Sequence, residues 1–342
     1  MRRVAIIVPV HDGAATLPTL FDALDRVDRI AEAEIVIVDD CSTDDSAEIA
    51  RERGFRVVGR AVQGGAAAAR NSGVRATRAP ILLFLDADTA PPPDTLGRVL
   101  EPFEAEDVVA LVGVYARRPL NRGFWPRYKA VQAESYHSHS AVSEITWIWG
   151  SMSAVRRDAF DEAGGFDERY RGADLEDVEL GRRLSMLGRV PLERRFIVGH
   201  HFPETLGANL RDHFHRGRHW SRLYLEGGGF DNYLTTRRMA ASRLAAATLP
   251  VGLVIALLSG GTAPWIVPIV GLFVYVALTR ALITLALREG GVRFAAAVLV
   301  AEMLLSCTLI AAGASVACER FATAIGFSAS APGRSGSDCA GR

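Results

Sequence analysis

The sequence predicts an α/β protein with a doubly wound, mostly parallel sheet, followed by helices that cross a membrane. Strand-like and helix-like segments alternate through residues 1–205, which predicts the sheet. The run Ile81–Leu85 is entirely apolar, as in a strand buried on both faces. Three long apolar stretches after residue 243 predict the membrane part, and 49% of the 342 residues are hydrophobic. The mean hydropathy of +0.15 is high for a soluble protein.

Segments in the amino-terminal region follow the order strand, helix, strand, helix, strand. Thr16–Val27 places its apolar residues on one helical face, and Thr43 is a typical helix N-cap. This order predicts parallel strands joined by right-handed crossovers. The predicted strands are Val4–Val8, Glu34–Val38, Phe55–Val58, Ile81–Leu85 and Val108–Tyr115, and the first two helices are Thr16–Val27 and Thr43–Gly54.

The charge balance excludes one broad class of function. The chain has 39 basic and 39 acidic residues, whereas a general nucleic-acid binder carries a basic excess. We therefore expect no nucleic-acid partner. The apolar run after Arg3 ends at Pro9 and is too short for a signal peptide, so we expect the amino-terminal domain to stay in the cytoplasm.

Two acids follow the buried strand at its carboxyl end, Asp86 and Asp88. Ligands of open α/β sheets bind at that edge, and paired carboxylates suit a hard cation and, through it, a diphosphate. Acidic pairs after strands are also common in turns, so this pattern alone leaves both interpretations open.

Three further segments each have two interpretations. The small residues of Gly64–Gly73 allow a helix start to bind phosphate, or simply to pack tightly on the sheet. Trp147 and Trp149 suit either a sugar-stacking platform or a core position on one side of a strand. In Asp174–Leu180, an N-cap at Asp174 and acids in the first helical turn stabilise a helix without any catalytic role.

Together, six motifs resemble those of the family-2 glycosyltransferases, which have the GT-A fold. The motifs are Ile7–Val10, Val38–Asp44, Ala66–Gly73, Asp86–Asp88, Gly164–Glu168 and Glu176–Asp177. The resemblance implies hexosyl transfer from a nucleotide-sugar donor, with inversion at the anomeric carbon. It also implies Mg²⁺ or Mn²⁺ as the cofactor.

The resemblance implies a role for individual positions. Pro9 and Asp40 would line the nucleoside pocket, Arg70 would face the nucleotide, Asp86 would reach the ribose, Asp88 would hold the metal, and Asp177 would be the catalytic base. Gly150 and Ser151 match small residues beside the donor sugar. His11 departs from the aromatic residue often found at its position, which puts base stacking there in doubt. His201 is either a metal ligand or a capping group.

The carboxyl-terminal region has the pattern of a membrane anchor. Leu206–Leu225 is a basic helical segment that suits either solvent or anionic lipid headgroups. Arginines flank the apolar stretches on one side only, which places the catalytic domain in the cytoplasm. We therefore expect an interfacial helix and about three transmembrane helices, at Leu244–Leu258, Ala263–Leu287 and Phe294–Cys318.

The predicted organisation has four parts: a cytoplasmic catalytic domain at 1–205, a juxtamembrane segment at 206–243, transmembrane helices at 244–318 and a disordered tail at 319–342. We expect a multi-pass enzyme of the inner (plasma) membrane that serves the cell envelope. Its acceptor would be a lipid or a glycan, with a polyprenyl phosphate as one candidate, and its helices would contact membrane lipids. The alternative is a non-catalytic membrane scaffold that retains a nucleotide-binding fold.

Arg280 and Glu302 are charges inside the apolar stretches. A charge in hydrocarbon is costly, so such residues usually pair or bind a polar ligand. Antiparallel helices would hold the two at nearly equal depth, which predicts an ion pair between them. The alternatives are that Arg280 binds a lipid phosphate, or that both side chains reach toward the headgroups.

Overall fold

The computed structural model describes the chain except for residues 1, 138–140, 173–174, 226–235 and 326–342. The predicted cap at Asp174 and residues 326–342 of the predicted disordered tail lie outside the described residues, whereas residues 319–324 of that tail are helical. The chain divides into two compact units. The first, here called the sheet unit, comprises Met1–Asn121 and Val142–His201. The second, the helical unit, comprises Arg122–Ala141 and Phe202–Ala331.

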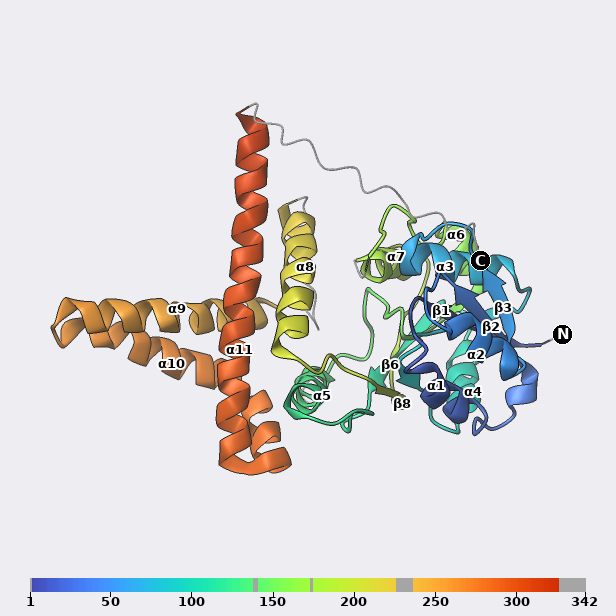
Figure 1. The fold of residues 1–342 in the computed structure, drawn as a ribbon, viewed down its shortest axis with the longest axis horizontal. Coiled ribbons are helices and arrows are strands. Elements are labelled where there is room, and N and C mark those ends of the chain that lie inside the picture. The colour runs from blue at the N-terminus through green and yellow to red at the C-terminus, as the bar shows by residue number, and fades with distance from the viewer. Residues whose placement is uncertain (1, 138–140, 173–174, 226–235, 326–342) are drawn as a thin grey trace. The chain divides into compact units, whose positions relative to one another are not determined.

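The sheet unit is built on a mixed sheet with the order β3-β2-β1-β4-β7-β6-β8-β5 (Figure 1). Strands β1 to β4 are parallel, β7 runs antiparallel to both β4 and β6, and β6 is parallel to β8. The prediction of a mostly parallel, doubly wound sheet is confirmed. The strands are β1 (Val4–Val10), β2 (Ala33–Asp39), β3 (Arg56–Gly59), β4 (Ile81–Leu85), β5 (Thr89–Ala90), β6 (Ala110–Tyr115), β7 (Met152–Arg156) and β8 (Leu192–His200).

Helices cover the sheet and bury its apolar strands. Leu82–Leu85 of β4 have no exposed surface, as the continuous apolar run predicts. The predicted apolar face of the first helix is also buried, including Leu17, Phe21 and Leu24. The helices are α1 (Leu17–Leu24), α2 (Ser46–Glu52), α3 (Gly65–Arg75), α4 (Thr95–Leu100), α6 (Arg157–Glu162) and α7 (Glu176–Ser185), with short 3₁₀ turns at Ile30–Glu32 and Glu101–Glu104.

One edge of the sheet collects the functional candidates. Because β6 and β8 run in the same direction as β1, β2 and β4, the carboxyl ends of all these strands meet at one edge. Asp40 follows β2, Asp86 follows β4, and His200 ends β8. Gly150 lies at the same edge, because it precedes the antiparallel strand β7.

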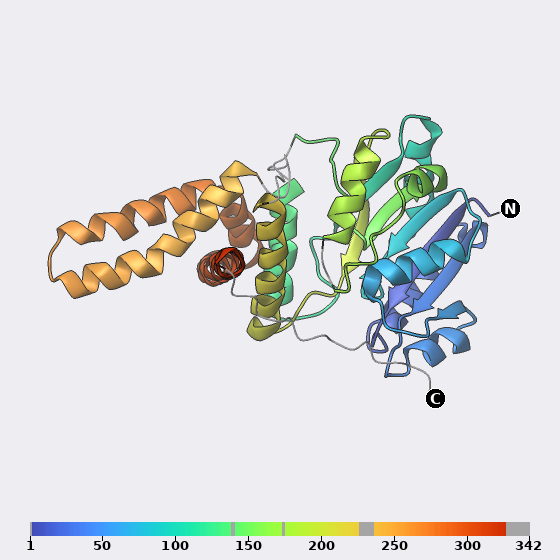
Figure 2. The same ribbon diagram turned by 90° about the horizontal axis from the view of Figure 1, so that it is seen from above.

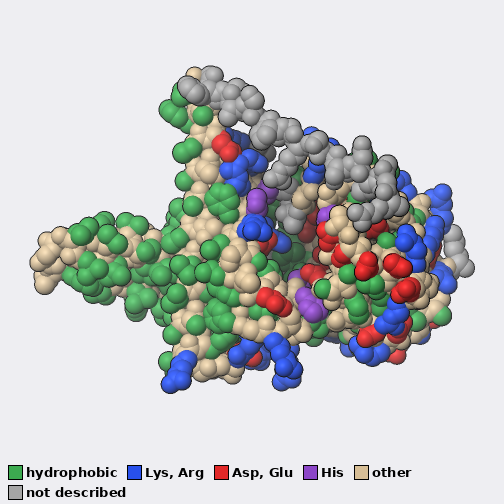
Figure 3. Space-filling model, viewed as in Figure 1, with side chains coloured by type: hydrophobic (Ala, Val, Ile, Leu, Met, Phe, Trp, Pro, Cys, Tyr) green, Lys and Arg blue, Asp and Glu red, His purple; other side chains and the backbone are tan. Residues whose placement is uncertain are grey.

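The helical unit contains a helical hairpin and a long, kinked helix. Helices α9 and α10 pack side by side and are joined by a short turn through Gly260 (Figures 1 and 2). Apolar side chains cover the surface of this hairpin (Figure 3). The elements of the unit are α5 (Phe124–His137), α8 (Leu206–Leu225), α9 (Arg237–Ser259), a 3₁₀ turn at Ala263–Trp265, α10 (Ile266–Leu278) and α11 (Arg280–Ala324).

Two helices of the described chain, α9 and α11, are long and apolar enough to cross a membrane, where the sequence predicts about three. The predicted second span, Ala263–Leu287, does not form one helix because α10 ends at Leu278. The Nε of Arg238 donates to the Leu278 carbonyl (3.0 Å), and the Thr279 hydroxyl donates to the Tyr275 carbonyl (2.7 Å). The bond from Arg238 satisfies the Leu278 carbonyl, which a continuing helix would otherwise pair.

Helix α8 packs along α11 (Figure 1). A Cβ on Gly217 would lie 2.9 Å from the Ala312 side chain, so the two helices approach closely. Arg218 donates to both carboxylate oxygens of Glu319 (2.7 and 2.9 Å), and Arg222 donates to one of them (3.2 Å). These two arginines, predicted to face lipid headgroups, therefore serve a contact between helices.

The predicted Arg280–Glu302 ion pair is wrong. Among the described residues, the cation that pairs with Glu302 is Arg243 of α9. The sequence predicted a turn at Arg288–Arg293 between two antiparallel helices, and α11 is indeed interrupted there, at the non-helical residues Gly290 and Gly291. Helix α9, which also packs on α11, supplies the partner instead.

We predict that Gly181→Ala in α7 lowers the stability of the protein by about 1–3 kcal/mol. A Cβ at this position would lie 2.2 Å from the Cα of Trp147, which is backbone and cannot move aside. Thermal unfolding of the full chain in detergent measures the loss.

The matched control is Gly97→Ala in α4, where a Cβ would meet nothing within 4 Å. Alanine favours a helix over glycine, so this variant should be as stable as the parent or more stable by up to about 1 kcal/mol. Equal stability of the two variants would contradict the close packing of α7.

Candidate active site

Arg70 of α3 connects three elements of the sheet unit. Its side chain is buried, with 4% exposed. One terminal nitrogen donates to Asp86 Oδ1 (2.7 Å) at the end of β4, and the other donates to Glu176 Oε1 (3.0 Å) at the start of α7. The guanidinium also lies over the Phe166 ring, 5.4 Å from its centroid. The predicted residues Arg70 and Asp86 are therefore in direct contact.

The two acids hold the charge of Arg70 in place. Burial alone would lower the pKa of this guanidinium, but the carboxylates of Asp86 and Glu176 hold the pKa above its ordinary value. Removing one partner of a buried ion pair typically costs about 3–5 kcal/mol, because the other charge is left uncompensated. Glu176 is thus an integral part of the site.

Gly150 brings Asp177 into the same group of residues. One Asp177 carboxylate oxygen accepts a hydrogen bond from the Gly150 amide (3.2 Å), and the other accepts one from the Val178 amide (2.8 Å). A Cβ at Gly150 would lie 2.3 Å from the guanidinium of Arg70, so only glycine allows this approach. Asp177 therefore contacts the first turn of its own helix and also faces the backbone beside Arg70.

Asp40 is 3% exposed and holds the start of α3. Its carboxylate accepts hydrogen bonds from the amides of Gly64 (3.0 Å) and Gly65 (2.7 Å) and from Nε of Arg60 (2.7 Å). Gly65 has φ +84°, a left-handed conformation that favours glycine. The amides of Gly64 and Gly65 at the predicted helix start are therefore paired with Asp40, and phosphate binding there stays a prediction.

Asp88 has the features of a ligand for a hard cation. Its side chain is 39% exposed, yet Oδ1 is buried and accepts no hydrogen bond from any residue that the structure describes. Burial and the nearby carboxylate of Asp86 raise the pKa of Asp88 to about 7. A divalent cation would favour the ionised form of both acids. The oxygen donors present therefore fit Mg²⁺ or Mn²⁺.

Two histidines lie beside Asp88 because β5 pairs with the end of β8. His200 Nε2 is 3.5 Å from Asp88 Oδ1, and the amide of His201 donates to the Asp88 carbonyl (2.9 Å). Among the described residues, no three His, Cys, Asp or Glu side chains form a group that could hold a metal. A cation at Asp88 would therefore take most of its ligands from the diphosphate and from water, as Mg²⁺ often does.

Other predicted positions divide between the site and the core. Pro9 is partly exposed in β1 and pairs with Val38 of β2. His11 Nδ1 lies 3.1 Å from the carbonyl of Asp40. Trp147 is 1% exposed and belongs to the core, so the core interpretation holds for it, whereas Trp149 is partly exposed. The hydroxyl of Ser151 is 2.7 Å from that of Tyr115.

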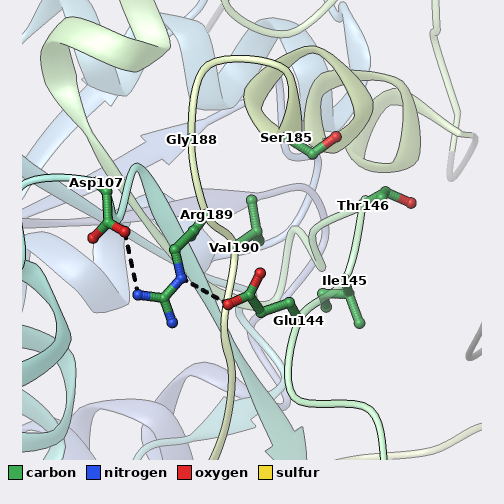
Figure 4. A pocket seen from close by; sticks show the side chains of 8 residues that line it. All are labelled: Asp107, Glu144, Ile145, Thr146, Ser185, Gly188, Arg189 and Val190. Carbon is green, nitrogen blue, oxygen red and sulfur yellow. Dashed lines mark hydrogen bonds and ion pairs between the residues drawn. The ribbon is translucent and has the colours of Figure 1, made fainter.

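A cavity of about 350 Å³ lies away from these residues (Figure 4). It is lined by residues that precede β6 and β8, such as Asp107 and Val190, and so lies at the opposite edge of the sheet. Arg189 in this cavity is paired with both Asp107 (3.3 Å) and Glu144 (2.7 Å). Because this cavity lies away from the functional edge of the sheet, we assign it no catalytic role.

Sequence reasoning assigned no role to three residues that build the site. Arg60 comes directly after β3 and so lies at the functional edge, a signal that the sequence offered. His200 ends β8 at the same edge. Glu176 was recognised as part of a motif but was given no role, because its contact with Arg70 depends on how α7 packs against α3.

Comparisons with known proteins bear on the family and the fold. Residues 5–164 match the family model described as Glycosyl transferase family 2. Validoxylamine A glucosyltransferase of Streptomyces hygroscopicus subsp. jinggangensis is 27% identical over 231 residues, which are 54% of this chain and 51% of that protein. Dolichol-phosphate mannosyltransferase of Pyrococcus furiosus is 26% identical over 215 residues, 61% of this chain and 58% of that protein. The chain thus matches only a little over half the length of these relatives.

A solved structure gives the same fold. The mannosyltransferase PcManGT of Pyrobaculum calidifontis, solved in complex with GDP-Man and Mn²⁺, aligns with a TM-score of 0.56 at 17% identity. The alignment covers 92% of this chain and 87% of that one. With the matched family model and the glycosyltransferase relatives, these findings confirm the resemblance seen in the motifs: the chain carries a family-2 glycosyltransferase domain with the GT-A fold.

Proposed function

We propose that the protein transfers a sugar from a nucleotide-sugar donor to an acceptor hydroxyl or phosphate, with inversion at the anomeric carbon. The observation that carries the proposal is the group formed by Asp86, Arg70, Glu176 and Asp177. In it, one buried cation fixes the end of β4 against the start of α7. A non-catalytic scaffold has no need for such a group beside a further acid, Asp88.

Each residue has a role in this reaction. Pro9 and Asp40 form the nucleoside side, Asp86 reaches the ribose, and Arg70 holds Asp86 in position. The Asp177 carboxylate takes the proton from the acceptor as the acceptor oxygen attacks the anomeric carbon. The bond from that carbon to the diphosphate breaks on the opposite face, and the nucleotide diphosphate leaves.

Asp88 would hold Mg²⁺ or Mn²⁺ against the diphosphate. When bound, the cation stabilises the negative charge that develops on the leaving nucleotide. Support comes from the buried Oδ1 of Asp88 and from the carboxylate of Asp86 beside it. The related fold of PcManGT was solved with Mn²⁺, which is consistent with this assignment.

We propose a membrane anchor in the helical unit, with the catalytic domain on the cytoplasmic face of the inner membrane. Large apolar side chains are exposed along α9 and α10, including Leu257, Ile266 and Phe273. Exposed apolar surface of this extent marks a membrane or protein contact. A lipid-linked acceptor, such as a polyprenyl phosphate, would be presented at the same surface, although a glycan acceptor fits the chemistry equally well.

The first test combines a donor panel with a variant of the base. Purified full-length protein in detergent is incubated with a series of nucleotide sugars and candidate acceptors, and release of the nucleotide is measured. Asp177→Asn should lower turnover on the productive pair by about 10²–10⁴-fold, because a general base contributes that much. Donor affinity should change little.

The matched control for Asp177 is Glu179→Gln, an acid of the same helical turn whose carboxylate pairs with Arg183 (3.0 Å). This variant should keep parental turnover. If Asp177→Asn lowers only the melting temperature and leaves turnover intact, the residue merely stabilises the start of α7.

The metal assignment is tested separately. Asp88→Asn should abolish transfer while leaving the fold and membrane insertion intact, and EDTA should do the same to the parent protein. Asp94→Asn, an exposed acid at the start of α4, serves as the control and should remain active. An Asp88→Asn variant that turns over at the parental rate in the presence of EDTA would rule out the metal at this position.

A further inference from the structure

A cavity of about 260 Å³ with several charged and polar side chains in its lining lies within the helical unit. Its lining includes Gln132 and Tyr136 of α5, Arg238, Ser242 and Arg243 of α9, and Glu302 of α11. The helices that enclose it carry exposed apolar residues on other faces. Charged groups inside an apolar helix bundle are rare and usually mark a binding site or a transport path.

The negative charge in the cavity is already neutralised. Glu302 is 2% exposed and pairs with Arg243. It also accepts hydrogen bonds from the hydroxyl of Tyr128 (2.7 Å) and from the side-chain amide of Gln132. These contacts join α5, α9 and α11. The charge of Glu302 is therefore compensated inside the bundle and does not repel an anion at the entrance of the cavity.

A positive charge remains at the entrance. Arg238 lines the cavity and is exposed. Its Nε donates to the Leu278 carbonyl, and within the described residues its two terminal nitrogens make no hydrogen bond. With Arg243 balanced by Glu302, Arg238 gives the lining one uncompensated cation.

The same entrance lies at the amino end of α9. Thr236 caps this helix, accepting from the Met239 amide (3.2 Å), and the first turn contains Arg237 and Arg238 and no acid. Cations are unfavourable at a helix amino terminus, where the helix dipole is positive. A bound anion would offset this excess of positive charge and would interact with both the helix dipole and the guanidinium of Arg238.

We propose that this cavity binds the phosphate group of an amphiphile, a phosphate monoester that carries an apolar chain. Arginine and a helix amino terminus are typical phosphate ligands. The volume is below the roughly 300–1,000 Å³ of sites for drug-sized molecules, so it suits a headgroup and excludes a whole nucleotide sugar. The chain of the amphiphile would lie along the apolar surface of α9 and α10. This inference rests on the proposed membrane anchor and does not depend on sugar transfer.

Calorimetry on the full chain in neutral detergent tests the site. The probe is dihexanoyl phosphatidic acid, with dihexanoyl phosphatidylcholine as the neutral control and inorganic phosphate as a second arm. Only phosphatidic acid should bind if the occupant is a lipid, whereas equally tight binding of inorganic phosphate would identify a soluble phosphate. Phosphatidylcholine binding as tightly as phosphatidic acid would overturn the proposal.

Arg238→Gln should weaken the binding of phosphatidic acid about tenfold or more, as expected for loss of a hydrogen bond between charged groups. The matched control is Arg237→Gln, which removes the neighbouring exposed charge outside the cavity lining and should change the affinity less than twofold. Equal losses in the two variants would indicate general surface charge and would overturn the proposal. Parental affinity in Arg238→Gln would show that this arginine only caps α10.

A second variant should act in the opposite direction. Glu302→Gln keeps the shape of the side chain but releases Arg243 from its ion pair, so phosphate binding should become several-fold tighter. The melting temperature without ligand should fall, and phosphatidic acid should raise it more than in the parent. A fall in melting temperature with no gain in affinity would assign Arg243 to structure alone and would overturn its place in the binding site.

Discussion

The site depends on one buried charge, the guanidinium of Arg70. A charge removed from water must be paired, and Arg70 is paired twice, with Asp86 and with Glu176. Because these acids come from the end of β4 and the start of α7, satisfying the charge fixes the distance between strand and helix. Gly150 has no side chain that would displace the guanidinium, and its amide donates a hydrogen bond to the neighbouring acid, Asp177. The position of the proposed base thus follows from the need to compensate Arg70.

The helical unit also contains a buried charge that must be paired. Glu302 is as deeply buried as Arg70, and it is satisfied by Arg243, Tyr128 and Gln132 from two other helices. Hydrogen bonds and an ion pair of this kind hold helices in one arrangement, since any shift would leave a buried charge unpaired. In both units, buried ionic contacts join elements that are distant in the sequence. The proposed phosphate site differs because its cation, Arg238, has no such partner among the described residues.

Local pattern predicted much of the fold and of the candidate site. Residues close together in the sequence determine the apolar run of β4, the apolar face of α1 and the acids after β2 and β4. The family resemblance identified Arg70 and Asp177 among the motifs. Partners set by packing could not be read in this way. The pairing of Glu302 required the direction of three helices, and the burial of Trp147 required the close approach of Gly181. The end of α10 at Leu278 was also missed, because long apolar segments lie on both sides of Thr279 and Arg280.

The most direct measurement of the central claim is a double-mutant cycle between Arg70 and Glu176. The variants Arg70→Lys, Glu176→Gln and the combination of both are compared with the parent protein for unfolding free energy, measured in detergent on the full chain. The account predicts a coupling of about 1 kcal/mol or more, because either substitution alone breaks the contact that both share. Losses that add to within about 0.3–0.5 kcal/mol would contradict it, since independent residues behave in that way.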